Sequence, residues 1–81
     1  MEYQLSLLEK VCKEFAFKSC AKLNELLSGG RRLPPDLFLT ALIGVVEDLI
    51  EEAKIKELAD TVKLLDEVRR DLEWSLREAI E

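Results

Sequence analysis

The side chains best able to do chemistry in this 81-residue chain are carboxylates, because the chain contains no histidine. Without histidine, neither a Ser-His-Asp nor a Cys-His catalytic arrangement can be built. Cys12 and Cys20 do not form a CxxC pair, so a zinc site is not expected. The sequence also lacks a glycine-rich phosphate-binding loop. Any catalytic chemistry would therefore depend on acidic side chains.

The acidic residues that could share a metal ion lie in one stretch of the second half. Glu47 and Glu51 are one helical turn apart, and Glu57 and Asp60 follow at i, i+3 spacing. On facing helices, carboxylates at these spacings can converge to hold Mg²⁺ or Mn²⁺ through oxygen ligands. The simpler interpretation is a solvated polar face, because like-charge i, i+4 pairs cost only about 0.2–0.5 kcal/mol without a cation.

The same stretch resembles the paired EExxE and ExxD motifs of the MazG-like family of all-α nucleoside triphosphate pyrophosphohydrolases. Glu47-Asp48-x-x-Glu51 corresponds to the first motif, with Asp48 in place of its second Glu, and Glu57-Leu-Ala-Asp60 corresponds to the second. The resemblance implies an enzyme that removes pyrophosphate from a nucleotide. It also implies that these four matching carboxylates, with Glu52 as a further candidate, hold Mg²⁺.

A second candidate site is centred on Trp74, the only tryptophan of the chain. Its position is roughly opposite the apolar stripe of the helix predicted there, with Arg70 at i−4 and Arg77 at i+3. Trp and Arg are enriched among interface hot spots, which favours an anchor for a second subunit or partner. The alternative is a ring that lies along its own helix and is covered by the two arginines.

The first part of the chain carries a second apolar strip outside its main stripe, formed by Tyr3, Leu7, Phe17 and Ala21. In a three-helix monomer this strip would be partly exposed. Together with Trp74 it indicates more apolar surface than one small bundle covers. Packing against a second copy is expected, because two-fold homodimers are the commonest assembly.

Three amphipathic helices would position these residues. The hydrophobic spacing predicts a helix over 3–28, a loop over 29–35, and helices over 36–53 and 56–80. Between the last two, the stripe shifts by about 130° at roughly 100° per residue, which favours two antiparallel helices over one bent helix. The sequence thus predicts a single all-α domain over 1–81, a three-helix antiparallel bundle that dimerises into a larger helical bundle.

Composition narrows the class of protein. The net charge of −5 disfavours nucleic-acid binding, and no apolar run approaches the roughly 20 residues that a membrane span needs. Within one helix the Cα atoms of Cys12 and Cys20 would be about 12 Å apart, too far for a disulfide. We therefore expect two unpaired core cysteines in a reducing compartment and a cytoplasmic, soluble protein.

The leading hypothesis is a non-enzymatic protein–protein interaction or homo-oligomerisation module, a scaffold or adaptor without a cofactor. Its partner would be a second copy or another protein, bound through the Trp74 site and the strip containing Phe17. The alternative is the Mg²⁺-dependent pyrophosphohydrolase. A third hypothesis, an acidic decoy of a nucleic-acid-binding protein, depends on residues 36–81, where six Lys/Arg against thirteen Asp/Glu give a charge of −7.

Overall fold

The computed structural model describes residues 2–29 and 32–80, which form an all-α fold without strands in these ranges. The helices are α1 (Glu2–Glu14), α2 (Cys20–Gly29), α3 (Pro35–Ile55) and α4 (Ala59–Ile80). None of the described helices is both long enough and apolar enough to cross a membrane. The predicted all-α class is confirmed, but there are four helices instead of three.

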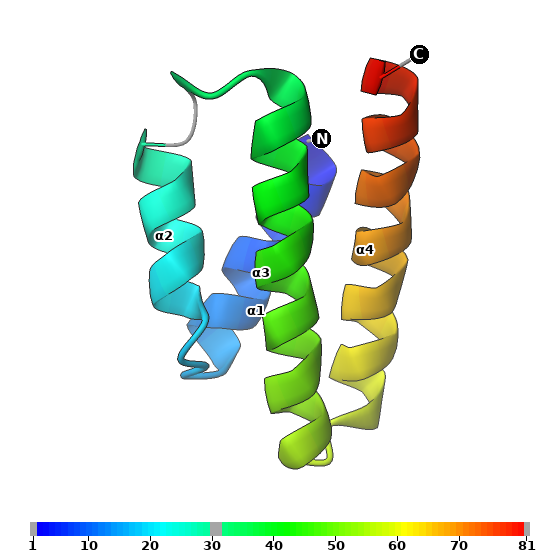
Figure 1. The fold of residues 1–81 in the computed structure, drawn as a ribbon. Coiled ribbons are helices and arrows are strands. Elements are labelled where there is room, and N and C mark those ends of the chain that lie inside the picture. Colours follow the sequence, from blue (N-terminus) through cyan, green and yellow to red (C-terminus); the bar gives the residue numbers. More distant parts are fainter. Residues whose placement is uncertain (1, 30–31, 81) are drawn as a thin grey trace.

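The two long helices, α3 and α4, form an antiparallel hairpin that is the centre of the fold (Figure 1). Two prolines mark the start of α3. Pro34 is its N-cap, and Pro35 lies in the first turn, where the backbone N–H groups have no helical partner and the N–H that proline lacks is not needed. The stripe shift near residues 53–55 is a true corner, as predicted, and not a bend in one helix. The helices expected over 36–53 and 56–80 are thus present. The first is slightly longer at both ends than predicted, and the second begins later, at Ala59, and ends at Ile80 as predicted.

The corner itself is a Schellman-type cap of α3. The N–H of Leu58 donates to the carbonyl of Ala53 at 3.0 Å, and the N–H of Glu57 donates to that of Lys54 at 3.0 Å. These are the two bonds of the motif, and they place Glu57 at the position that adopts left-handed backbone geometry. Its φ is 58°, although it is not a glycine. A corner without Gly or Pro is therefore built at the expense of backbone strain at one residue.

The predicted helix over 3–28 is wrong, because the chain leaves helical geometry after Glu14 and resumes it at Cys20. The turn between them lets α1 and α2 pack on different partners. α2 lies against α3, while α1 runs obliquely behind the hairpin and contacts α4 (Figure 1). A single straight helix could not make both contacts, so the break allows a short chain to cover both members of the hairpin.

A disulfide between Cys12 and Cys20 closes this turn, with the two Cα atoms 5.8 Å apart. The expectation of two unpaired cysteines is therefore wrong, and with it the argument for a reducing compartment. The distance argument failed because it assumed an unbroken helix. Inside the turn, Phe17 is 4% exposed and its ring stacks on that of Phe15, with 5.4 Å between the centroids.

All four helices contribute to one hydrophobic core. Its fully buried side chains come from every helix, and the largest of them are Leu8 from α1, Leu23 from α2, Leu42, Val46 and Leu49 from α3, and Leu65, Val68 and Leu72 from α4. On α3 and α4 these positions recur every three or four residues, which is why the periodicity predicted both helices. The core fixes the rotation of α4 and so decides which of its residues face solvent.

Candidate functional site

The outer face of α4 carries the largest aromatic side chain of the protein in solvent. Trp74 is 62% exposed, whereas Leu72 in the same helix is almost completely buried. Because the leucine stripe turns toward α3 and α1, the rotation of the helix leaves the indole on the opposite side. The sequence prediction that Trp74 lies off the apolar stripe is confirmed.

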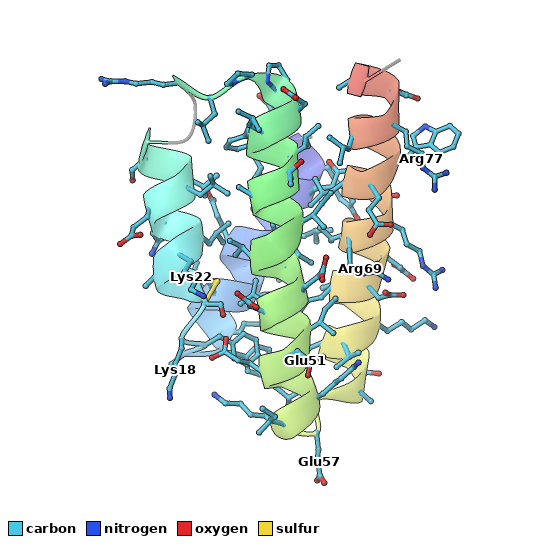
Figure 2. The ribbon with its side chains drawn as sticks, in the orientation of Figure 1. Lys18, Lys22, Glu51, Glu57, Arg69 and Arg77 are labelled. Carbon is cyan, nitrogen blue, oxygen red and sulfur yellow. A yellow bond between two sulfur atoms is a disulfide. The ribbon has the colours of Figure 1, made fainter. Side chains whose placement is uncertain are left out.

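The two arginines beside Trp74 are both exposed. Arg70 forms an ion pair with Asp66, with Nη2 and Oδ2 3.1 Å apart, and keeps 72% of its side chain accessible. A cation–π contact is present at a different place in the molecule, where the Nζ of Lys56 lies 5.0 Å from the centroid of the Phe17 ring. Figure 2 labels Arg77 on the outer side of α4, away from the other helices.

The predicted second strip does not form one surface. Tyr3, near the start of α1, is 68% exposed, but Leu7 is half-buried and packs against the core. Phe17 lies in the turn between α1 and α2 and is a core residue. Its prediction as an exposed interface residue is therefore wrong, because that prediction assumed a continuous helix over 3–28. The surface therefore retains Tyr3 and Trp74 as exposed aromatic residues, both on helices that contact each other.

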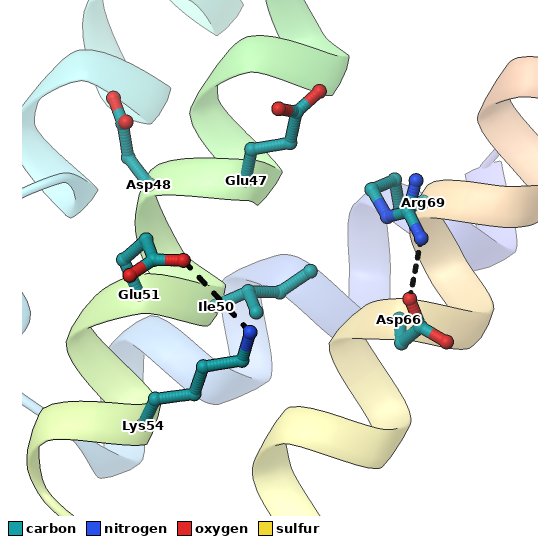
Figure 3. Close-up of a pocket in the computed structure, with 7 residues that line it drawn as sticks. All are labelled: Glu47, Asp48, Ile50, Glu51, Lys54, Asp66 and Arg69. Carbon is teal, nitrogen blue, oxygen red and sulfur yellow. Dashed lines mark hydrogen bonds and ion pairs between the residues drawn. The ribbon is translucent and has the colours of Figure 1, made fainter.

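The candidate metal ligands are divided between two places. Glu47 and Glu51 line a shallow groove of about 310 Å³ between α3 and α4, together with Lys54, Asp66 and Arg69 (Figure 3). The other two, Glu57 and Asp60, belong to a different hollow at the corner. Within the part of the chain that the structure describes, no group of three or more acidic or cysteine side chains is arranged to hold a metal ion.

Basic side chains already occupy the groove. Arg69 bonds two carboxylates at once, with Nη2 at 2.7 Å from Asp66 Oδ1 and Nη1 at 2.8 Å from Glu73 Oε1. The hydrogen bond from Arg69 lowers the pKa of Asp66, as do the charges of Arg70 and Arg69, and it raises the pKa of Arg69 itself. The Nζ of Lys54 lies 3.8 Å from Glu51. Asp66 and Glu51 of the groove are thus each paired with a basic side chain.

The sequence offered Glu52 only as a further candidate for the metal site, and its structural role was not predicted. Glu52 of α3 accepts hydrogen bonds from the backbone N–H groups of Lys18 and Ser19, at 2.7 Å and 3.1 Å. It therefore holds the turn between α1 and α2 against α3. Nothing in its local spacing distinguishes Glu52 from its neighbour Glu51, because its partners are more than thirty residues away in sequence.

No family model, curated protein or solved structure matches this chain. The resemblance of residues 47–60 to pyrophosphohydrolase motifs is therefore not supported by a family match.

Proposed function

We propose that this protein is a non-enzymatic interaction module that associates through the exposed face of α4, with Trp74 as its anchor and a second copy of the chain as its partner. The observation that carries the proposal is the indole itself, 62% exposed on a helix whose opposite side is fully buried. A scaffold or adaptor role is the class of function that such an anchor supports.

Burial of the Trp74 ring in a complex would contribute favourably to the free energy of association. A tryptophan side chain offers about 150–250 Å² of contact area. At about 25 cal/mol per Å², covering the exposed portion in a complex would contribute on the order of 3 kcal/mol. That is a hot-spot contribution, and it must offset the loss of translational and rotational freedom on association. An interface therefore needs further favourable contacts around Trp74.

The residues around Trp74 supply such contacts. Arg70 and Arg77 flank the ring on the same face, and both are exposed. Exposed Tyr3 adds a second aromatic residue on α1, the helix that contacts α4. Leu7 is half-buried and packs against the core, so it contributes little to this surface.

Light scattering and fluorescence across a concentration series test the proposal. Because Trp74 is the only tryptophan, its emission reports directly on whether this face becomes covered. We expect the mass to rise from 9.3 kDa toward twice that value, with a parallel blue shift of the emission. Trp74→Ala should abolish the rise in mass.

The matched control is Ile55→Ala, which removes an apolar side chain that is 79% exposed at the end of α3. This variant should associate as the wild type does. A wild-type mass that stays at 9.3 kDa up to about 1 mM would exclude self-association in a range where weak complexes are populated. Equal weakening by both variants would show that general surface hydrophobicity, not the Trp74 anchor, drives association.

A further inference from the structure

We infer that the outer face of α4 pairs with the same face of a second copy in parallel orientation, about a two-fold axis that runs along the helix and passes beside Trp74. The inference deepens the proposed function and rests on it, since it names the orientation and the charge pairs of that association. The face is the exposed side of α4, with the indole at its centre.

Charged side chains on this face are sorted by sign into two edges. At roughly 100° per residue, the exposed basic residues lie about 20–60° to one side of Trp74 around the helix axis, and the exposed acidic residues lie about 20–60° to the other side. The basic edge is formed by Lys63, Arg70 and Arg77, and the acidic edge is formed by Glu67, Asp71 and Glu78. The core residues Leu65 and Leu72 point in the opposite direction. The face therefore has one positive edge and one negative edge.

This sorting favours one orientation of a second copy. A two-fold axis parallel to α4 places the basic edge of each copy opposite the acidic edge of the other. A two-fold axis perpendicular to α4 would pair the helices antiparallel and bring like edges together. Arg77 would then meet Arg70 of the second copy, and Asp71 would meet Glu78. Like charges across an interface oppose association, so the charge pattern favours the parallel pair.

Opposite charges also meet at nearly the same height in the parallel pair. Arg70 and Asp71 of the second copy differ by about 1.5 Å along the axis, and so do Arg77 and Glu78 of the second copy. Identical arginines lie on opposite sides of the two-fold axis, so each is nearer to a carboxylate of the second copy than to its own counterpart. Each ion pair occurs twice, as an isologous interface requires, and the two indoles meet at the centre as the apolar contact.

The ion pair between Arg70 and Asp66 does not prevent this pairing. Its 3.1 Å contact uses one terminal nitrogen of a side chain that is 72% exposed. A guanidinium has five N–H donors, so Arg70 can keep Asp66 and still reach a carboxylate from outside. A single helix-to-helix contact is small, so we expect a weak dimer that forms at high protein concentration.

A charge reversal distinguishes the two orientations, because it changes the association in opposite directions. Arg77→Glu places a carboxylate opposite Glu78 in the parallel pair and should weaken dimerisation about tenfold. In an antiparallel pair the same carboxylate would lie opposite Arg70 and would strengthen dimerisation. Light scattering between about 10 μM and 1 mM measures the dissociation constant, and circular dichroism verifies that each variant is folded.

Two double variants of equal net charge complete the test. Arg77→Glu/Glu78→Arg restores opposite charges in the parallel pair and should return the dissociation constant to within about threefold of the wild type. Arg77→Glu/Asp71→Arg is the matched control, because it creates like-charge contacts with both Glu78 and Arg70 of the second copy. We expect it to dimerise as weakly as Arg77→Glu or more weakly.

Tighter dimerisation of Arg77→Glu, or equal behaviour of the two double variants, would overturn the parallel pairing. If Trp74→Ala dissociates the dimer while all charge variants dimerise as the wild type does, the proposed function stands and this geometry is rejected. A wild-type chain that stays monomeric rejects both.

Discussion

The carboxylate of Glu52 accepts a 2.7 Å hydrogen bond from the backbone N–H of Lys18, a residue 34 positions earlier in the chain. Its second oxygen accepts the N–H of Ser19, which immediately precedes α2. A carboxylate at this position satisfies N–H groups that lack helical partners and faces the positive end of the helix dipole. One side chain of α3 therefore caps α2 and closes the turn that separates it from α1.

Replacing this carboxylate should loosen the turn. We expect Glu52→Ala to lower the free energy of unfolding by about 1–2 kcal/mol, as for the loss of a helix cap. Urea denaturation measures the effect. Glu51→Ala is the control, because Glu51 contacts only Lys54 among the ion pairs of the described residues and at 3.8 Å. Its effect should stay below about 0.5 kcal/mol, and equal losses in both variants would contradict the capping role.

The stability of the protein should fall in acid because of the same residue. Partial burial raises the pKa of Glu52, but hydrogen bonds from the backbone of Ser19 and Lys18 outweigh it, so the pKa lies below the ordinary value of 4.5. The folded state then binds fewer protons than the unfolded state. The resulting stabilisation is present above about pH 4.5 and is lost as pH falls through the folded pKa.

Denaturation of the wild type and Glu52→Gln at about pH 7 and about pH 3 tests this dependence. The Gln variant should be less stable at neutral pH and should lose less stability on acidification, since it has no proton to take up at this site. The pKa of Asp66 is also lowered, so Asp66 makes both proteins lose some stability in acid. A difference between the two proteins that is the same at both pH values would show that Glu52 does not act through its charge.

The disulfide should stabilise the fold by constraining the unfolded chain. Cys12 and Cys20 are separated by 8 positions, and closing a loop of this length contributes about 2.5 kcal/mol in the chain-entropy description. We expect the double variant Cys12→Ser/Cys20→Ser to lose about that amount in urea denaturation. Wild-type protein treated with a dithiol reductant is the control and should match the variant. Full retention of stability in both would contradict the role of the bond.

Periodicity predicted the parts of the fold in which local pattern and tertiary packing agree. On α3 and α4 the buried positions, such as Leu42, Leu49, Leu65 and Leu72, repeat with the helical period, and this also placed Trp74 on the outer face. The two prolines at the start of α3 are a local signal for the beginning of a helix, and the tertiary packing agrees with that signal. These features could be predicted because each depends on residues within a few turns of one another.

The break between α1 and α2 could not be predicted in this way. Residues 15–19 contain neither glycine nor proline, and an apolar stripe continues through them, so their local preference is compatible with a helix. What separates the helices is a covalent bond between Cys12 and Cys20 and the long-range cap from Glu52. The error carried over to Phe17, because its predicted surface position depended on a helix that does not continue.

Glu57 offers the clearest route to a more stable protein. It occupies the left-handed position of the α3 cap with φ of 58°, where a side chain with a Cβ costs about 1 kcal/mol and glycine costs little. Glu57→Gly should therefore raise the free energy of unfolding by about 0.5–1 kcal/mol, even though glycine adds entropy to the unfolded chain. Glu57→Ala keeps the backbone strain but removes the charge, so the stability of this variant should stay close to that of the wild type.

The neighbouring Lys56 has φ of −85°, and Lys56→Gly should be destabilising. Thermal and urea denaturation of the three variants would show this order, and a gain from Lys56→Gly equal to that from Glu57→Gly would locate the effect outside the left-handed backbone of residue 57.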